Sequence, residues 1–331
     1  MLKIGSIKLD TNLFLAPLAG CADLSFRLIC REHGAGFCFY EMVDSNSLVR
    51  SSGKNKDTLM THAKDHPIAA QILGGDPETT LEAARILLAK VKPLFLDLNA
   101  ACPAKKVLRK KAGAYLVREP RVLYAILSRL ASSLDLPITV KMRIGYDRVD
   151  LAGLAAIAKN CEAAGAAALF VHGRTSKQLY CGQVNYEAIR AVKQRVSIPV
   201  IGSGDVLSPE LAKKMFDATG CDGLLVARGA MGNPWIFERI AGYLKTGREQ
   251  TGVGFEQKKR VLLRHLAYME KYRQSRPTNK MGLMRKIALL YLRSFPGAPG
   301  IRARITPIKS YPELVEAVSG IKRRWNNGKR P

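Results

Sequence analysis

The sequence lacks long apolar runs and paired cysteines. No apolar run in its 331 residues approaches the roughly 20 residues that a membrane-spanning helix needs, and the first residues lack the apolar stretch of a secretory signal. The seven cysteines are an odd number and include no Cys-x-x-Cys pair, which argues against disulfides and zinc. We therefore expect a cytoplasmic globular protein with free thiols and no metal.

Acidic residues are also scarce, most of all near the C-terminal end. The chain has 53 Lys and Arg against 27 Asp and Glu, a formal net charge of +26. Residues 245–331 alone contain 21 of the basic residues and five Glu. This asymmetry is typical of a protein that binds a polyanion, either a nucleic acid or an acidic membrane surface. The alternative is a basic surface that serves solubility alone.

Eight short apolar runs alternate with helix-like segments. They lie at residues 13–16, 37–40, 68–73, 94–98, 137–140, 168–171, 199–201 and 223–226. Near-continuous apolar strands between helices are typical of a parallel sheet buried on both faces, and eight of them favour closure into a (β/α)8 TIM barrel. A doubly wound open sheet is the alternative, although residues 202–207 lack the third glycine of a dinucleotide-binding loop. Residues 2–9 resemble a small hairpin that would plug the bottom of the barrel.

A second domain follows the eighth run. Residues 242–254 are polar and glycine-rich, which predicts a linker. Beyond it, apolar residues recur at helical spacing, for instance from Val261 to Met269. We expect a barrel domain at 1–243 and a basic, all-helical domain of three or four helices at 255–331.

Polar or glycine residues follow the apolar runs nearly all the way round. They include Glu41, Gln71, Asn99, Lys141, Arg143, His172, Arg174, Gly204, Asp205 and Arg228. In a (β/α)8 barrel the carboxyl ends of the strands form the active site, and the loops after strands seven and eight commonly hold a phosphate. Glycines in those two loops allow close approach to an anion. The layout predicts a phosphate-bearing cofactor, whereas each residue alone could merely cap a strand.

Three side chains suit a flavin site. Lys141 would stabilise the negative charge of a reduced flavin ring. Gln71 and Asn99 carry neutral amides that can hydrogen-bond a flavin or a pyrimidine edge.

Cys102 stands out among the cysteines. It follows the fourth run and precedes Pro103, which disfavours helix, so the thiol is expected on a loop. A thiol there can donate a proton to a developing carbanion. Lys105 and Lys106 follow at once, and a basic loop over an active site suggests a polyanionic substrate. The other six cysteines are expected to be small core or helix residues.

Four strings resemble the tRNA-dihydrouridine synthase family, most strongly its bacterial B-type branch. They are APLAG at 16–20, NAACPAKKV at 99–107, KMR at 141–143 and VHGRT at 171–175. The resemblance implies FMN in the barrel mouth, NADPH as reductant and tRNA as substrate. It also implies hydride transfer from the reduced flavin to C6 of uracil, with Cys102 donating the proton to C5.

The resemblance assigns site residues position by position. The implied cofactor contacts are Ala16, Pro17, Leu18, Gln71, Lys141, His172, Gly202, Ser203, Gly204, Asp205, Ala227, Arg228 and Gly229. The implied substrate contacts are Asn99, Lys105, Lys106, Arg174, Tyr180 and Arg285. We expect a monomer with tRNA and NADPH as partners and no membrane partner.

The chain departs from the family pattern at three places, and two rival functions stay open. Ala100-Ala101 stand where Met-Gly is usual, Ser203 where Asn is usual and Ile287 where His is common. If the backbone before Cys102 needs a positive φ, alanine there is strained. A flavin oxidoreductase of the dihydropyrimidine or dihydroorotate type would leave the basic tail unexplained. A non-catalytic RNA-binding barrel would leave the chemistry-bearing side chains unexplained.

Overall fold

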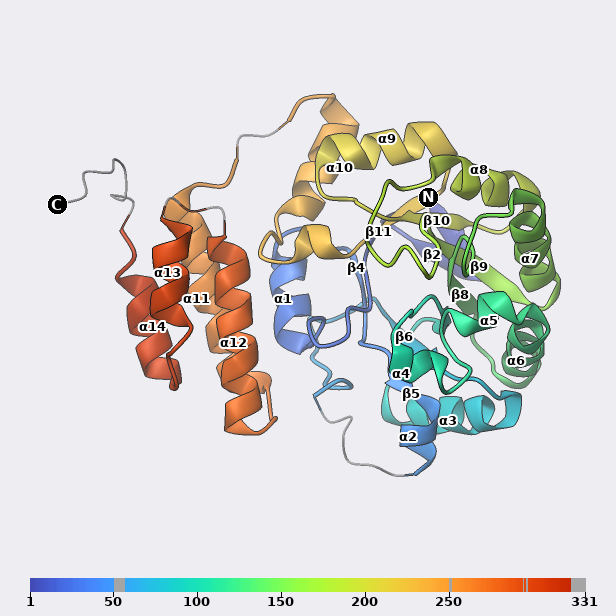
Figure 1. The fold of residues 1–331 in the computed structure, drawn as a ribbon, viewed down its shortest axis with the longest axis horizontal. Helices are drawn as coiled ribbons and strands as arrows, with labels where there is room; N and C mark the ends of the chain where they lie inside the picture. The colour runs from blue at the N-terminus through green and yellow to red at the C-terminus, as the bar shows by residue number, and fades with distance from the viewer. Residues whose placement is uncertain (51–56, 250–251, 294, 296, 323–331) are drawn as a thin grey trace.

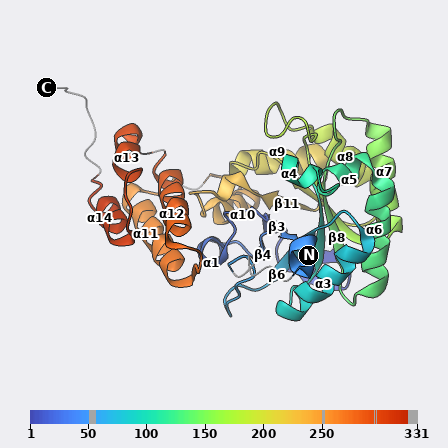
Figure 2. The same cartoon turned by 60° about the horizontal axis from the view of Figure 1, so that its bottom comes forward.

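The protein has a barrel and, at its flank, a separate group of helices (Figure 1). The structure is a computed structural model that describes every residue except 51–56, 250–251, 294, 296 and 323–331. The C-terminal helices lie on the side of α1 (Leu24–Glu32) that faces away from the barrel strands, and the second view agrees (Figure 2).

Eight parallel strands form the barrel, one for each predicted apolar run. They are β3 (Leu13–Leu15), β4 (Phe37–Phe39), β6 (Ile68–Leu73), β7 (Leu96–Ala100), β8 (Ile138–Arg143), β9 (Ala166–His172), β10 (Val200–Ser203) and β11 (Gly223–Val226). The pairing of β4 with β6 closes the circle, which confirms the (β/α)8 barrel and excludes the open sheet. A short strand, β5 (Val43–Asp44), pairs with β6 at the rim.

Helices lie between the strands, as the alternation of apolar runs and helix-like segments predicts. After α1 come α2 (Ser45–Val49), α3 (Pro77–Lys90), α4 (Lys105–Leu108), α5 (Tyr115–Arg118), α6 (Pro120–Ser133), α7 (Leu151–Ala163), α8 (Tyr186–Arg195), α9 (Pro209–Thr219), the 3-10 turn η2 (Arg228–Ala230) and α10 (Ile236–Thr246). Several begin at a capping side chain: Asp76 and Ser208, for example, accept the N–H three residues on, and a proline follows each cap.

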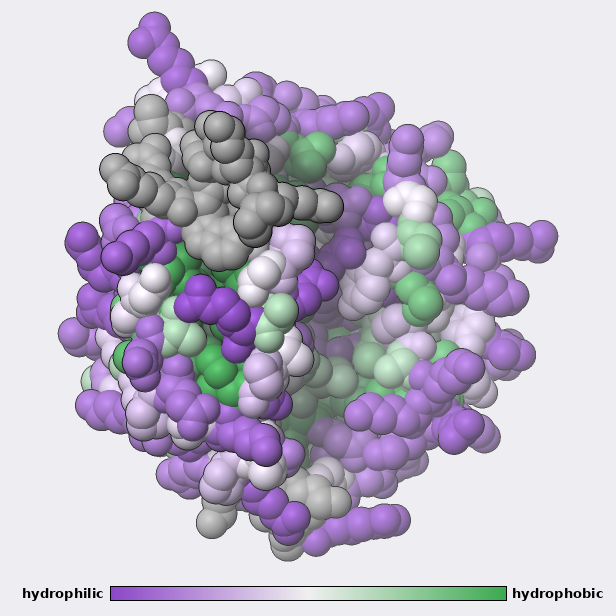
Figure 3. All heavy atoms as spheres, turned by 60° about the vertical axis from the view of Figure 1, so that its left-hand side comes forward, coloured by the Kyte–Doolittle hydropathy of each residue, from purple (hydrophilic) through white to green (hydrophobic). Residues whose placement is uncertain are grey.

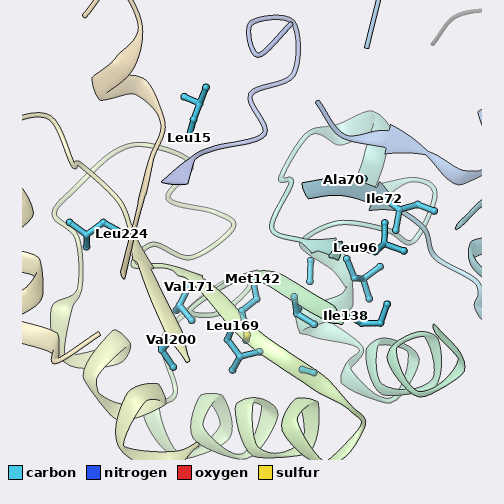
Figure 4. Close-up of a cluster of buried hydrophobic side chains, with 14 of the residues drawn as sticks. Leu15, Ala70, Ile72, Leu96, Ile138, Met142, Leu169, Val171, Val200 and Leu224 are labelled. Atoms are coloured by element: carbon cyan, nitrogen blue, oxygen red, sulfur yellow. The ribbon is translucent and has the colours of Figure 1, made fainter. Parts of the chain in front are cut away.

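Each barrel strand buries side chains on both faces. Outward side chains such as Leu169 and Val200 point toward the surrounding helices (Figure 4). Inward, the Phe14 ring packs against the rings of Phe37 and Phe170, with centroids 5.2 and 5.4 Å away. The predicted hairpin is present as β1 (Leu2–Ile4) and β2 (Ile7–Leu9), and its buried residues join this inner cluster. Toward the carboxyl ends of the strands the inward positions turn polar, so the site lies opposite the hairpin.

Four helices follow the barrel within the described residues. They are α11 (Phe255–Tyr272), α12 (Pro277–Leu292), α13 (Ala298–Ile305) and α14 (Tyr311–Ser319). Their apolar core also includes Ile29 of α1 and Trp235 before α10, so these helices and the barrel share one buried cluster. In the described part of the chain, no helix combines the length and the hydropathy needed to cross a bilayer.

The predicted linker begins later than expected. Helix α10 continues through Thr246, and Gly247 ends it in the left-handed conformation with a φ of 68°. The prediction of a linker from residue 242 was therefore wrong for its first five residues, because glycine at 242 is accommodated inside the helix. The domain limits at 243 and 255 stay a prediction, and the predicted end of the second domain, residues 323–331, lies outside the described residues.

Candidate active site at the mouth of the barrel

A cavity of about 230 Å³ opens at the carboxyl ends of the barrel strands. It gathers most of the residues that the sequence singled out: Ala16, Pro17, Leu18, Gln71, Asn99, Cys102, Lys141, His172, Tyr180, Ser203, Gly204, Asp205, Ala227, Arg228 and Gly229. Five others are not part of its lining: Gly202, Lys105, Lys106, Arg174 and Arg285. The fold thus brings together residues more than 200 positions apart in the sequence.

A ladder of hydrogen bonds orients the amides on one wall. Thr139 Oγ1 donates to Asp97 Oδ1 at 2.7 Å, and Gln71 Nε2 donates to Asp97 Oδ2 at 2.7 Å. Asn99 Nδ2 then donates to Gln71 Oε1 at 2.8 Å. Asp97 was not among the predicted site residues, although a lone carboxylate inside an apolar run is a signal that could have identified it. Burial raises the pKa of Asp97 to about 6.

Lys141 and His172 enter the cavity from neighbouring strands, as the sequence predicted. Burial, followed by repulsion from the Arg143 guanidinium, lowers the pKa of Lys141 to about 8, so most of it remains protonated at neutral pH. Burial and the surrounding cations lower the pKa of His172 to about 2, so this imidazole is neutral. These two residues therefore present one cation and one neutral ring to the cavity, which Arg143 and Arg228 also line.

Cys102 lies on a loop, as predicted, and the loop is held from inside the barrel. Asn99 Oδ1 accepts the N–H groups of Ala101 at 3.0 Å and Cys102 at 2.9 Å. The buried Arg143 donates from Nε to the Ala101 carbonyl oxygen at 2.9 Å. Among the described non-glycine residues, a positive φ occurs only at Lys111, Leu179 and Asp205. Alanine before Cys102 is therefore unstrained, and the expected cost of the departure from Met-Gly does not arise.

The far side of the same loop is held by the backbone. Ala114 N donates to the Cys102 carbonyl oxygen at 3.0 Å. Gly113 has a φ of 64°, and a Cβ there would come within 2.6 Å of that oxygen. Only glycine allows this approach, so the half-buried thiol is held in place at the cavity wall.

The loops after β10 and β11 contact each other. A Cβ at Gly229 would collide with the carbonyl oxygen of Val206, so the two loops pack as one unit. Gly202, in contrast, faces helix α9: a Cβ there would meet Met215 Sδ at 2.6 Å. Its role is close packing behind the cavity wall.

Asp205 is the centre of an arginine pair. Its carboxylate accepts hydrogen bonds from both terminal nitrogens of Arg174 and from Arg228 Nη2 at 2.7 Å. These guanidinium groups lower the pKa of Asp205, with the Arg174 hydrogen bond as the largest cause. Arg174 is buried and also donates to the carbonyl oxygens of Cys181 at 3.0 Å and Gly182 at 2.6 Å. It therefore braces the loop after β9, whereas the Arg228 guanidinium lies 4.4 Å from the centre of the Tyr180 ring.

The remaining predicted residues lie around the cavity. Lys105 and Lys106 are exposed on α4. Arg285 lies on α12, where its Nη1 donates to the Ile308 carbonyl oxygen at 2.6 Å. All seven cysteines are free, as predicted. Cys181 is exposed on a loop, so the expectation that it is a core or helix residue was wrong.

The donor set fits a flavin carrying a phosphate. A largely protonated lysine and two oriented amides suit a ring that gains negative charge on reduction. The glycine-containing loops after β10 and β11, together with Arg228, suit a phosphate. The neutral His172 adds a polar contact and no charge.

Comparison with known proteins agrees with this description. The dihydrouridine synthase family model matches residues 14–324. The tRNA-dihydrouridine synthase B of Pseudomonas aeruginosa is 40% identical over 311 residues, 93% of this chain and 92% of that protein. The protein of the same name from Escherichia coli K12 is 37% identical over 320 residues, 96% of this chain and 98% of that one.

Two solved structures share the fold. Histamine dehydrogenase from Rhizobium sp. 4-9 is 13% identical with a TM-score of 0.57, covering 81% of this chain and 50% of its own. A morphinone reductase variant in complex with tetrahydroNAD is 15% identical with a TM-score of 0.54, and the match covers 72% of this chain and 89% of that one. At such identities these likenesses concern the barrel architecture alone.

Proposed function

This chain belongs to the dihydrouridine synthase family, and from that premise we propose that it reduces uridine in tRNA to 5,6-dihydrouridine, with FMN in the barrel mouth and Cys102 as the proton donor. NADPH is the reductant in this proposal. The observation that carries it is the Cys102 thiol, which is fixed at the wall of a cavity that also holds Lys141 and Gln71.

The residues of the cavity divide into two groups. The first group would hold FMN, with Gly202 packed behind it. It consists of Ala16, Pro17, Leu18, Gln71, Lys141, His172, Ser203, Gly204, Asp205, Ala227, Arg228 and Gly229. FMN, when bound, supplies the hydride. Lys141 favours negative charge on the ring beside it, because its cation is partly desolvated and directed into the cavity.

Cys102 acts on the other side of the uracil. Its thiol gives a proton to C5 as hydride reaches C6, so the ring gains two hydrogens and the thiol becomes a thiolate that is reprotonated from solvent. Asn99 keeps the loop in register because its amide accepts the N–H of Cys102 itself. Tyr180, exposed beside the cavity, presents an aromatic face to a base entering there.

The substrate side is basic. A uridine within folded tRNA has to leave its stack to reach the cavity, at a cost of a few kcal/mol. Phosphate contacts from Lys105, Lys106 and the C-terminal helices, including Arg285, would offset that cost. Figure 3 shows hydrophilic residues over much of the surface on the side of these helices.

Cys102→Ala tests the proposal. The variant should keep its flavin and its reduction by NADPH, because the thiol takes no part in that half-reaction. Dihydrouridine formation in tRNA should fall by about 10²–10⁴-fold, the usual contribution of a general acid. Flavin bleaching by NADPH and mass spectrometry of nucleosides from treated tRNA measure the two halves.

Cys181→Ala is the matched control, since that thiol is exposed and is not part of the cavity lining. It should behave as the wild type in both measurements. Wild-type rates of dihydrouridine formation in the Cys102 variant would show that the proton comes from elsewhere.

A further inference from the structure

The loop between β3 and α1, residues 16–23, has two sides with different neighbours. On one side Pro17, Leu18 and Ala19 line the cavity. On the other side Cys21 and Asp23 contact the C-terminal helices. This loop is therefore a direct connection between the helical region and the cofactor cavity.

The cavity side of the loop is a tight turn that a buried carboxylate holds. The Leu18 carbonyl oxygen accepts the N–H groups of Cys21 at 3.0 Å and Ala22 at 2.8 Å. Glu41, which follows β4, accepts the Gly20 N–H through Oε2 at 2.5 Å. Burial raises the pKa of Glu41, whereas the hydrogen bond from Gly20 lowers it. Glu41 is one of the polar residues predicted at the strand ends, and its hydrogen bond to Gly20 gives it a role in holding this turn.

The helical side of the loop is held by two cations. Arg273 follows α11 and donates from Nη1 to Asp23 Oδ2 at 2.8 Å, and both side chains are largely buried. Asp23 uses its other oxygen to cap α1, accepting the N–H of Phe26 at 3.0 Å. Lys286 of α12 donates from Nζ to Cys21 Sγ at 3.2 Å.

Helix α1 of the barrel adds a contact to Ala22, which lies between Cys21 and Asp23. The fully buried Arg27 donates from Nη1 to the Ala22 carbonyl oxygen at 2.7 Å. Cys21, Ala22 and Asp23 are thus each held by a hydrogen bond. The contacts to Cys21 and Asp23 come from the helical region. Among the described residues, the loop makes four hydrogen bonds to distant parts of the chain. Without Arg273 and Lys286 it would keep two of them, from Gly20 to Glu41 and from Ala16 to the Val226 carbonyl oxygen.

We propose that Arg273 and Lys286 are positioning residues of the cofactor site: the C-terminal helices set the conformation of the loop that lines it. The proposal rests on the proposed function for the identity of the cofactor, FMN. It gives the helical region a role in the flavin half of the reaction, which an RNA-binding surface alone would not have. It also means that a ligand on these helices and a ligand in the cavity affect each other reciprocally.

Lys286→Met and Arg273→Met in the full-length protein test this. Lys286 is solvent-exposed, so its variant should fold even if the loss of the buried Arg273 pair is destabilising. If the loop keeps its binding conformation only about a tenth of the time, the Kd for FMN rises about tenfold. Quenching of flavin fluorescence on titration of the apoprotein gives that Kd. Hydrogen exchange of the peptide spanning residues 16–23 in the apoprotein should be faster in both variants.

Arg264→Met is the matched control. Arg264 of α11 pairs with Glu32 of α1 at 3.1 Å, so it also joins the helices to the barrel, but it is not among the contacts of residues 16–23. Its FMN affinity and its exchange in this peptide should match those of the wild type. The positioning role is overturned if both test variants behave as Arg264→Met does. A wild-type protein that binds no FMN would instead contradict the proposed function, while the exchange measurement would still report on the loop.

Discussion

The wall behind the barrel mouth and the outer surface of the C-terminal helices both carry arginine, but the arginines differ in what surrounds them. At the mouth, Arg143 and Arg174 are each 2% exposed, and backbone carbonyl oxygens or a carboxylate accept their hydrogen bonds. On the helices, Arg293, Arg302 and Arg304 are exposed. The buried arginines fix the geometry of loops, whereas the exposed ones contribute positive charge to the surface.

This difference changes how the net charge is interpreted. The sequence counts all 53 cations alike, although a guanidinium enclosed by carbonyl groups has no capacity left for a phosphate. Arg174 is the clearest case. The family resemblance implied a substrate contact, and the structure places it behind the wall, bonded to Asp205. Its role toward RNA stays a prediction, whereas its contacts indicate a structural role at the cofactor loops.

The largest expected effect is on stability, from removing a buried arginine. Arg174→Met should remove four hydrogen bonds, two to Asp205 and two to carbonyl oxygens, which at about 1 kcal/mol each costs about 4 kcal/mol. Urea unfolding measures the change. Arg302→Met, on the exposed surface of α13, should change stability by no more than about 0.5 kcal/mol. If the two substitutions lowered the free energy of unfolding equally, buried and exposed arginines would not differ in their structural role.

One buried group in each region, His265 in the helices and Asp97 in the barrel, should contribute to the pH dependence of stability with opposite sign. His265 of α11 is buried against Phe26, and burial lowers its pKa from 6.5 to about 4. Its contribution to stability is present above pH 6.5 and is lost as pH falls toward 4. Asp97 in the barrel has a pKa raised from 3.8 to about 6, so its contribution is present below pH 4 and is lost as pH rises through 6. Each of these pKa shifts corresponds to a change of roughly 3 kcal/mol in the free energy of unfolding.

Variants isolate the two contributions. His265→Phe should lose less stability than the wild type between pH 7 and pH 4, because the phenyl ring takes up no proton. Asp97→Asn should lose less than the wild type between pH 4 and pH 7. Denaturant unfolding at pH 4, 5.5 and 7 measures both. If the two variants changed the pH profile with the same sign, the assignment of either buried group would be wrong.

The smallest expected effect concerns RNA affinity. Each exposed cation that contacts a phosphate contributes about 0.9 to the slope of log affinity against log salt. Arg302→Gln together with Arg304→Gln should therefore reduce that slope by about 2 and weaken tRNA binding evenly across tRNA species. Filter binding between low and physiological salt measures it. Lys213→Gln, on α9 and ion-paired with Asp217, is the control whose slope should stay at the wild-type value.

Much of the fold could be predicted from local pattern. Each of the eight apolar runs became a barrel strand, because a strand buried on both faces has to be apolar along its whole length. The hairpin at residues 2–9 followed from alternation around Gly5. The linker prediction failed at Gly242, because glycine content alone does not distinguish a loop from a helix whose other residues are buried by their neighbours.

The sequence by itself determined that most of the predicted side chains meet at the mouth of the barrel. Parallel strands all end at the same rim, so residues such as Gln71, Lys141 and His172 had to converge once the fold was known. Only the tertiary structure decided what each of them contacts. The hydrogen bonds from Gln71 to Asp97, from Arg174 to Asp205 and from Arg273 to Asp23 join residues 26, 31 and 250 positions apart. Such pairs depend on distances of about 3 Å between side chains, and local periodicity carries no information about them.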